Sequence, residues 1–412
     1  MPAEIITIGN ELLEGRVTDT NATWIADRLT LAGLAVKRIS SVPDCRGEVA
    51  GILEEAERRS DVIIVGGGLG PTHDDVTKAA LCDFFGTHLV ENKSVLENIK
   101  QLLRKKQLPL NKNNRRQAEI PANADPVMNP LGTAPGLWME KEKKIFVVIP
   151  GVPFEMENIV EKEIIPRLTR SLKLPAHYQK TIVTSGSFEA MLADILRDFE
   201  NELPENVTLA YLPSPGIIRL RLGARDQSMQ KAKESVEGQA EKLKKIIPQY
   251  IVGYNEETLE MIVGNMLKAN NKTLCTIESC TGGKISSMLV SVPGCSQYFK
   301  GGIVVYSNEL KTGLLNIDDN ILSKYGAVSK QTVEAMAVNG SRIMQTDYSV
   351  AISGIAGPDG GTPQKPAGMV CIAVNTPRGC FSDIFYFGDN RERNIKRASV
   401  TALNMLRKNI KT

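Results

Sequence analysis

The chain has 412 residues, enough for two to four domains at roughly 100–200 residues per domain. It carries 50 Lys and Arg residues against 47 Asp and Glu residues, a balance that argues against a nucleic-acid or membrane surface. The seven cysteines form no CxxC pair, which is typical of a reducing compartment and excludes the usual zinc spacings. Because no run reaches the ~20 apolar residues of a membrane span, and no signal peptide is apparent, we expect a cytoplasmic protein.

Predicted strands and helices alternate in the first part of the chain. Strands are predicted at 3–9, 36–42, 61–65 and 143–149, and the run at 61–65 is near-continuously apolar, as is typical of central parallel strands. A Gly-Asn-Glu turn follows the first strand, and helices are predicted at 21–33, 46–59, 75–85, 92–106 and 154–168. This alternation predicts a parallel sheet covered by helices, which we place at residues 1–172.

The rest of the chain divides into two further segments. Residues 176–252 predict a small α+β module, with strands near 180–184 and 216–222 and helices near 187–200 and 227–246. From 256 to 412 the α/β pattern resumes, with strands at 273–277, 302–306, 348–353, 369–375 and 381–387. Helices are predicted there at 259–269, 283–290, 330–345 and 392–410. We therefore expect an α/β protein of two three-layer α/β domains joined by a small α+β module.

The segment ESCTGG, residues 278–283, stands where a predicted strand ends and a helix begins. Such a junction places small polar side chains at a sheet edge and leaves backbone N–H groups free at the helix start. Ser279 is a candidate nucleophile there, and Gly282 and Gly283 allow the backbone to approach a substrate oxygen or phosphate. An ordinary helix N-cap is the alternative, because Ser and Thr are common before helices.

A serine nucleophile needs a base. No histidine follows His177, so the C-terminal region cannot form a Ser-His-Asp triad, and Lys311 is the candidate base, as in Ser-Lys enzymes. Tyr306, at the end of the preceding predicted strand, is a candidate proton relay. Only about one free lysine in 2,500 is neutral at pH 7, so the site would have to lower its pKa. From spacing alone, a solvent-exposed helix lysine is the commoner case.

A further glycine-rich strand end is GIAGPDGG, residues 354–361. Four glycines and a proline directly after a predicted strand favour a shaped loop over a linker. Its backbone N–H groups suit a phosphate or a developing oxyanion, although a long turn is the plainer interpretation.

These segments, TIESCTGGKISS, YFKGGIVVYSNELK, YGAVS, GIAGPDGGTPQKPAG and GDNRERNIKRASVTALNMLRK, together resemble the C-terminal domain of the CinA family, the nicotinamide-nucleotide amidases. The resemblance covers nearly all of 256–412 and implies cofactor-free hydrolysis of nicotinamide mononucleotide to nicotinate mononucleotide and ammonia. It implies Ser279 as nucleophile, with Lys311 and Tyr306 in its activating set. The implied substrate-binding residues are Thr281, Gly282, Gly283, Gly354, Ala356, Gly357 and Arg391. Cys280 is an alternative nucleophile, since a thiol could also attack, but we prefer the serine.

The segment GGGLGPTHDD, residues 66–75, follows the third predicted strand. Its glycines permit close approach to a phosphate, and Asp74 and Asp75 could hold a divalent cation that bridges phosphates. The segment is not GxxxxGK[ST], so it is no P-loop. A turn with acidic residues at a helix N-terminus is the alternative. Glu11 and Asp19, after the first strand, could face the same cleft.

The stretches IITIGNELLEGRVTDTNATWIADRL, GGGLGPTHDDVTK, NPLGTAPG and IPGVPFEM resemble the molybdopterin-binding-like domain that begins CinA proteins, over about 1–170. The resemblance implies a metal-dependent ADP-ribose pyrophosphatase that uses Mg²⁺, Mn²⁺ or Co²⁺, with K⁺ as a further candidate. Asp74 and Asp75 would be the metal ligands. The implied nucleotide-binding residues are Glu11, Asn21, Gly67, Gly68, Gly70, Thr72, Asn129 and Gly132. A nucleotide-binding domain with lost or weak catalysis, or a molybdopterin-binding domain, remains open.

The middle segment corresponds to the KH-like module of the family. It lacks a GxxG clamp, so it is better interpreted as a spacer or dimerisation module than as an RNA-binding one. The family suggests a homodimer that acts on small nucleotides, nicotinamide mononucleotide and ADP-ribose, without nucleic-acid or membrane partners. An interaction protein linked to competence is the alternative, but it would need neither Ser279 nor Lys311.

Overall fold

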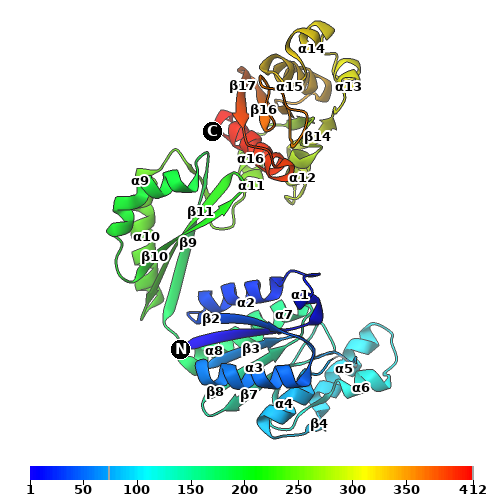
Figure 1. Ribbon diagram of the computed structural model, residues 1–412, viewed down its shortest axis with the longest axis vertical. Helices are drawn as coiled ribbons and strands as arrows, with labels where there is room; N and C mark the ends of the chain where they lie inside the picture. The colour runs from blue at the N-terminus through cyan, green and yellow to red at the C-terminus, as the bar shows by residue number, and fades with distance from the viewer. Residues whose placement is uncertain (73–74, 411–412) are drawn as a thin grey trace. The chain divides into compact units, whose positions relative to one another are not determined.

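The computed structural model describes residues 1–72 and 75–410, and the chain divides into two compact units (Figure 1). The first unit comprises residues 1–178 and 225–232, and the second comprises 179–224 and 233–412. Most of the KH-like segment therefore belongs to the same unit as the C-terminal α/β domain.

The first unit is built on a six-stranded sheet with the order β2-β1-β3-β8-β7-β6. Its parallel strands are β2 (Ala35–Val42), β1 (Pro2–Ile8), β3 (Val62–Gly66) and β8 (Lys144–Ile149), close to the predicted positions. The antiparallel strands β7 (Gly136–Lys141) and β6 (Asp125–Val127) were not predicted. Glu142 and Lys143 both have positive φ and form a two-residue turn, which can only join β7 and β8 antiparallel.

Helices cover both faces of this sheet (Figure 1). One face carries α2 (Thr20–Leu31), α7 (Pro153–Ile159), a π-helical turn (Val160–Ile164) and α8 (Ile165–Leu172). The other carries α3 (Arg46–Arg59) and α4 (Thr77–Phe85). Within β1, Ile5 packs on the first face and Ile6 on the second, so both faces of the strand are buried, and its polar residues Glu4 and Thr7 are buried as well.

Short elements complete the first unit. They are α1 (Asn10–Leu13), β4 (Leu89–Glu91), α5 (Lys93–Lys105), α6 (Lys112–Arg116) and β5 (Glu119–Pro121). The sequence predicts α5 but not the other four. The expected Gly-Asn-Glu turn is instead the short helix α1, which directly follows Gly9.

The KH-like module has a four-stranded sheet with the order β10-β11-β9-β12. Its elements are β9 (Ala176–Ser185), α9 (Glu189–Asn201), β10 (Val207–Ser214), β11 (Ile217–Asp226), α10 (Met229–Ile246) and β12 (Ile251–Tyr254). The strand β10 was not predicted because it lies at the sheet edge, where most of its side chains are exposed and leave no long apolar run. Val183 and Val252 from this module join one core of the C-terminal domain.

The C-terminal domain has a five-stranded sheet with the order β14-β13-β15-β16-β17. The strands are β14 (Phe299–Val304), β13 (Leu274–Glu278), β15 (Tyr348–Gly354), β16 (Met369–Thr376) and β17 (Gly379–Tyr386). The first three are parallel, and β16 and β17 continue antiparallel. The observed β14 ends two residues before Tyr306, which was predicted to end that strand.

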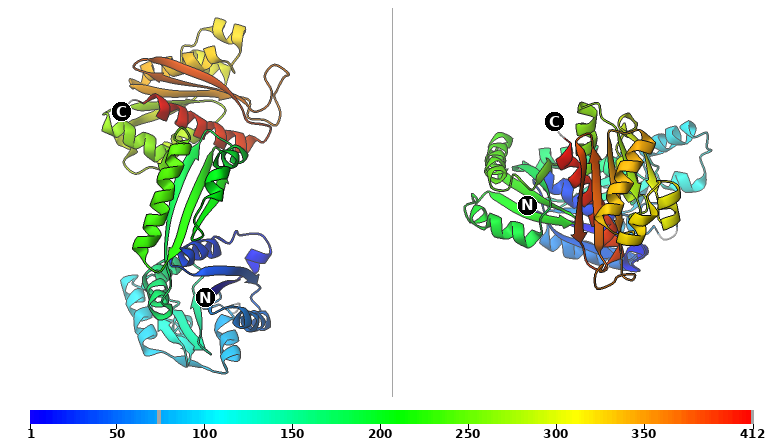
Figure 2. Two further views of the ribbon diagram at one scale, coloured as in Figure 1. Left: turned by 90° about the vertical axis from the view of Figure 1, so that its left-hand side faces the viewer. Right: turned by 90° about the horizontal axis from the view of Figure 1, so that it is seen from above.

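This sheet also lies between two helical layers (Figure 2). One layer contains α11 (Leu259–Ala269), α12 (Lys284–Val290) and α16 (Arg391–Asn409). The other contains α15 (Lys330–Met344), with α13 (Asn308–Gly313) and α14 (Asp319–Tyr325) nearby. The predicted fold class, two three-layer α/β domains with an α+β module between them in the sequence, is confirmed. Within the described ranges, no helix is long and apolar enough to cross a membrane.

Candidate active site

Ser279 lies directly after β13, at the carboxyl end of a parallel strand between β14 and β15. Its N–H donates to the carbonyl of Ile352 at 3.0 Å, and the residue is 7% exposed. A tight turn then leads into α12, with φ values of 59° at Gly282 and 96° at Gly283. Both are left-handed conformations that favour glycine, so the turn itself explains the glycine pair.

Lys311 lies on α13 and is 1% exposed, so the interpretation of this residue as an exposed helix lysine is wrong. Its Nζ is 3.3 Å from the Oγ of Ser279. The same Nζ contacts three backbone carbonyl oxygens, at 2.9 Å for Val305, 3.2 Å for Tyr306 and 3.4 Å for Ser307. Burial lowers the pKa of Lys311, which favours the neutral amine that a general base requires.

Cys280 is a poor competitor for the role of nucleophile. It is 7% exposed, and burial raises the pKa of its thiol to about 12. Only about one thiol in 10⁵ would be ionised at pH 7 with such a pKa, and the thiolate is the reactive form. The geometry therefore favours Ser279, which contacts the buried amine.

Glu278 organises the turn that follows Ser279. This last residue of β13 is completely buried, and its carboxylate accepts five hydrogen bonds. Its Oε2 accepts from the Thr281 hydroxyl at 2.7 Å and from the N–H groups of Gly283 and Ile285 at 3.1 and 3.0 Å. Its Oε1 accepts from the N–H and hydroxyl of Ser286 at 2.8 and 2.7 Å. A buried carboxylate is stabilised when its oxygens are satisfied in this way.

The expectation of free N–H groups at the start of α12 is therefore wrong for Gly283, since Glu278 already binds that group. The N–H of Gly282 is also engaged, by the carbonyl of Ser279 at 3.1 Å. In the described part of the chain, the N–H groups of Cys280 and Thr281 donate to no oxygen. These two are the donors next to Ser279 that remain for a substrate oxygen.

Arg391, the first residue of α16, connects two of the predicted site segments. Its Nη1 donates to the carbonyl of Gly357 at 3.2 Å, and its Nη2 donates to the hydroxyl of Tyr306 at 3.1 Å. Tyr306 is 61% exposed, and its hydroxyl makes no hydrogen bond with Lys311 or Ser279. Only the carbonyl of Tyr306 reaches Lys311, so this geometry does not make its side chain a proton relay.

The loop at residues 354–361 is held by close packing and by hydrogen bonds. A Cβ atom on Gly354 would lie 2.7 Å from Val370, and φ at Gly357 is 82°. The carbonyl of Ala356 accepts from the amide of the buried Asn394 at 3.0 Å. Arg391 forms no ion pair with any described residue, so its charge is available for a ligand at this loop.

In the first unit, the glycine-rich loop after β3 borders a cavity of about 450 Å³. Glu11, Gly67, Gly68, Gly70 and Asp75 are among its lining residues. A second cavity of about 190 Å³ is lined by Glu11, Gly67, Asn21 and Asp19 among others. The structure thus brings most of the predicted nucleotide-binding residues together at the carboxyl ends of parallel strands. Thr72, Asn129 and Gly132 line neither of these two cavities.

Asp75 closes its own loop. Its Oδ1 accepts from the N–H of Gly70 at 2.7 Å, and its Oδ2 accepts from the N–H of Thr72 at 2.8 Å and from the Thr72 hydroxyl. Asp74 lies outside the described residues. Over the described ranges, no group of three His, Cys, Asp or Glu side chains is placed to hold a metal ion. The side chains of the described residues therefore do not by themselves form a ligand set for a divalent cation.

Asn129 shapes the NPLGTAPG loop from inside. It is completely buried, and its Nδ2 donates to the carbonyl of Ala134 at 2.9 Å and to Glu155 at 2.7 Å. Its Oδ1 accepts from the N–H groups of Leu131 and Gly132, both at 3.0 Å. Asn21 makes a comparable link, since its Nδ2 donates to the carbonyl of Gly151 at 2.7 Å. Asn129 therefore supports the loop without facing the cavity.

The comparisons with known proteins agree on a family. A CinA-like protein of Flavobacterium psychrophilum is 42% identical over 412 residues, covering 100% of this chain and 99% of the relative. The chain belongs to the CinA family. A CinA-like protein of Cytophaga hutchinsonii is 40% identical, covering 99% of this chain and 98% of the relative.

Three family models match successive parts of this CinA-family chain. They are a probable molybdopterin binding domain at residues 4–170, the damage-inducible protein CinA KH domain at 179–253 and the CinA C-terminal domain at 256–410. Among solved structures, a CinA protein of unknown function from Thermoplasma acidophilum is 35% identical, covers 41% of this chain and 96% of that chain, and has a TM-score of 0.37.

Two polar residues of this CinA-family chain were not singled out from the sequence. Glu278 ends a buried apolar strand, and a carboxylate in that position must find donors, which was the available signal. Lys78 follows the glycine-rich loop, and its Nζ donates to the carbonyl of Gln117 at 2.9 Å. Burial lowers the pKa of Lys78 to about 8. The burial of Lys78 could not be read from the sequence, because it depends on which segments pack against α4.

Proposed function

We propose that the C-terminal domain is a serine amidase that hydrolyses nicotinamide mononucleotide to nicotinate mononucleotide and ammonia. The observation that carries this proposal is the buried Nζ of Lys311, 3.3 Å from the Oγ of Ser279. A buried amine beside a hydroxyl at a strand end is the pairing that Ser-Lys hydrolysis needs. The identity of the substrate comes from the resemblance to the nicotinamide-nucleotide amidases.

In the first step, the Oγ of Ser279 attacks the carboxamide carbon while the neutral Lys311 amine accepts the hydroxyl proton. Negative charge develops on the former carbonyl oxygen, and the N–H groups of Cys280 and Thr281 are the donors that remain to stabilise it. The Lys311 ammonium then protonates the leaving nitrogen. The C–N bond breaks, ammonia departs, and an ester remains on Ser279.

In the second step, a water molecule attacks that ester and Lys311 accepts the water proton. The bond to Ser279 breaks, Lys311 returns the proton to Oγ, and nicotinate mononucleotide is released. We assign the substrate phosphate to Arg391 and the loop at residues 354–361. Arg391 already contacts that loop through Gly357 and has no carboxylate partner among the described residues.

The test is ammonia release from nicotinamide mononucleotide by the wild type, Ser279→Ala and Cys280→Ala, each checked for native circular dichroism. We expect Cys280→Ala to keep most of its activity and Ser279→Ala to lose it. Loss in Cys280→Ala with survival of Ser279→Ala would preserve the chemistry but change the nucleophile. A folded wild type that releases no ammonia would end the amidase proposal and leave a competence-linked interaction protein as the leading account.

We further propose that the first unit binds a nucleotide and hydrolyses ADP-ribose to AMP and ribose 5-phosphate. The specific observation is the cavity of about 450 Å³ lined by Gly67, Gly68 and Gly70. A requirement for Mg²⁺, Mn²⁺ or Co²⁺, with K⁺ as a second ion, rests on the family resemblance alone. ADP-ribose turnover with each ion and with a chelator tests it; binding without turnover would support a nucleotide-binding or molybdopterin-binding domain.

We also propose that the chain works in the cytoplasm as a homodimer on small nucleotides. Light scattering at several protein concentrations measures the oligomeric state directly. A mass equal to one chain at all concentrations would exclude the dimer without affecting the amidase proposal.

A further inference from the structure

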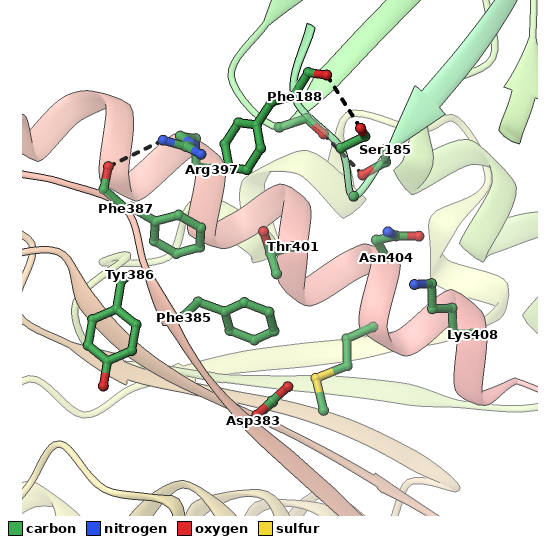
Figure 3. A pocket seen from close by; sticks show the side chains of 14 residues that line it. Ser185, Phe188, Asp383, Phe385, Tyr386, Phe387, Arg397, Thr401, Asn404 and Lys408 are labelled. Atoms are coloured by element: carbon green, nitrogen blue, oxygen red, sulfur yellow. Dashed lines mark hydrogen bonds between the residues drawn. The ribbon is translucent and has the colours of Figure 1, made fainter. Parts of the chain in front are cut away.

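A cavity of about 450 Å³ lies within the second unit (Figure 3), and Ser279 is not among the residues that line it. One wall is the KH-like loop of residues 185–188, and another is the end of β17 around Phe385 and Phe387. Helix α16 forms the floor. The volume of the cavity is within the roughly 300–1,000 Å³ range of small-molecule sites.

The floor is a polar stripe along α16. Arg397, Thr401, Asn404 and Lys408 all line the cavity and follow one another at steps of four, three and four residues. Such spacing places them on one face of the helix, and Figure 3 shows them in a row. At about 1.5 Å rise per residue, the stripe spans roughly 16 Å between two cations. This length suits an elongated ligand better than a single small ion.

The cationic groups of this stripe have no anionic partner among the described residues. In the part of the chain that the structure describes, neither Arg397 nor Lys408 forms an ion pair. Asp383 also lines the cavity, but it pairs with Lys330 at 3.3 Å. Burial and, secondarily, the nearby Arg393 lower the pKa of Arg397. An anion in the cavity would compensate for this unfavourable charge.

Asn404 supplies a directed polar group. It is 6% exposed, and its Oδ1 accepts from the Nε of Arg407 at 3.0 Å. Its Nδ2 makes no hydrogen bond to any described residue. Because Asn404 lines the cavity, this Nδ2 can donate to water or to a ligand there. The floor therefore offers a hydrogen-bond donor between its two cations.

The walls are aromatic. Phe385 and Phe387 stack with ring centroids 6.1 Å apart and planes 5° from parallel, and Tyr386 between them points to the other side of the strand (Figure 3). Phe188 is 65% exposed and covers the guanidinium of Arg397 at 5.5 Å from its ring centroid. Phe387 lies 5.2 Å from the same guanidinium. Flat apolar faces beside cations are suited to a ligand that joins a planar ring to a separate anionic group.

We propose that this cavity binds a mononucleotide, with its base against Phe188 and the Phe385–Phe387 wall and its phosphate on a cation of α16. The proposed ligand must have both a planar ring and an anionic group. Inorganic phosphate lacks the ring and a neutral aromatic compound lacks the anion, so neither is the proposed ligand. This binding site is separate from the Ser279 site and does not depend on the amidase proposal.

The experiment is photolabelling of the full chain with 8-azido-AMP, followed by peptide mapping by mass spectrometry. We expect a label within residues 185–188 or 383–387 that AMP suppresses at concentrations about tenfold lower than adenosine or ribose 5-phosphate, since each of these lacks one recognised part. Equal competition by ribose 5-phosphate would show that the base is not recognised and would overturn the proposal. Labelling confined to the first unit or to the Ser279 segment would do the same.

Two variants and two matched controls complete the experiment. Phe188→Ala and Lys408→Gln should each reduce the label at this cavity by about tenfold, because the first removes an aromatic face and the second removes a cation. Met191→Ala, on an exposed residue of α9, and Lys396→Gln, which removes a partner of Glu392, should leave it unchanged. Wild-type labelling in both cavity variants would contradict the proposal. Native circular dichroism of all four variants is required, so that a loss of label in a cavity variant cannot come from unfolding.

Discussion

At the scale of single residues, the environment of Lys311 determines how the amidase should respond to pH. Three carbonyl oxygens can accept from its ammonium form, but only the neutral amine can accept the proton of Ser279. Burial lowers the pKa of Lys311 from its ordinary value of 10.5. Between the folded pKa and 10.5 the unfolded chain binds more protons, so this residue contributes stability that rises with pH over that window.

We predict that kcat/KM for nicotinamide mononucleotide rises about tenfold per pH unit until Lys311 is neutral, because the base must be unprotonated. The plateau should be reached below pH 10.5, since burial lowers this pKa. Steady-state rates across the range in which circular dichroism is unchanged measure this. A flat profile would argue against Lys311 as the base.

We also predict that Lys311→Arg loses activity by about 10²–10⁴-fold at every pH, because a guanidinium cannot release its proton. Lys324→Arg, an exposed lysine on α14, is the control and should retain wild-type rates. Ammonia release measures both. Activity of Lys311→Arg within about tenfold of the wild type would mean that another group takes the proton.

At the scale of elements, the start of α12 depends on Glu278. The first N–H groups of a helix have no partner within the helix, and here the carboxylate at the end of β13 binds those of Ile285 and Ser286 as well as that of Gly283. One side chain thus joins a strand end to a helix start across the turn that carries Ser279. The position of Ser279 should therefore be sensitive to this carboxylate.

We predict that Glu278→Gln destabilises the second unit by about 2–4 kcal/mol, because an amide NH₂ would replace an acceptor oxygen and face buried donors. Denaturant unfolding followed by circular dichroism measures the change, and ammonia release should fall with it. The control is Glu256→Gln, at an exposed position before α11, which should leave the free energy of unfolding unchanged. A loss below about 1 kcal/mol would show that the network around Glu278 is not a major support.

Elements differed in how readily they could be predicted. Core strands such as β3 and β13 have apolar runs that identify them directly. The edge strand β10 and the short helices α13 and α14 lack such a pattern, because their side chains are largely exposed. The sequence therefore predicted the architecture correctly but did not predict these peripheral elements. One of them, α13, carries Lys311.

At the scale of the whole molecule, the two candidate sites belong to different compact units. Ser279 and Lys311 lie in the unit that begins at residue 179, and the glycine-rich loop lies in the unit of residues 1–178. Each unit has its own sheets and its own cores. A local change in one site should therefore have little effect on the chemistry of the other.

We predict that Gly68→Ala weakens nucleotide binding by the first unit by about tenfold or more, because a left-handed residue with a Cβ is strained. The added Cβ would lie 2.1 Å from the Oγ1 of Thr77, at a φ of 64°. Ammonia release should stay within about twofold of the wild type, as expected for sites that share no contact partners. Gly51→Ala, where a Cβ meets no atom within 4 Å, is the control. A parallel loss of amidase activity in Gly68→Ala would reveal coupling between the units.

The fold class, the main strands and the three glycine-rich strand ends could be read from the sequence, because periodicity and turn residues are local properties. The roles of individual polar groups required the folded chain. Lys311 is buried only because the turn after β14 wraps around it, and its contact with Ser279 joins residues 32 apart. The N–H group of Gly283, which was expected to be free, donates to Glu278. Asp75 accepts a hydrogen bond from its own loop. Burial and hydrogen-bond partners depend on which segments pack together, and spacing along the chain does not specify that.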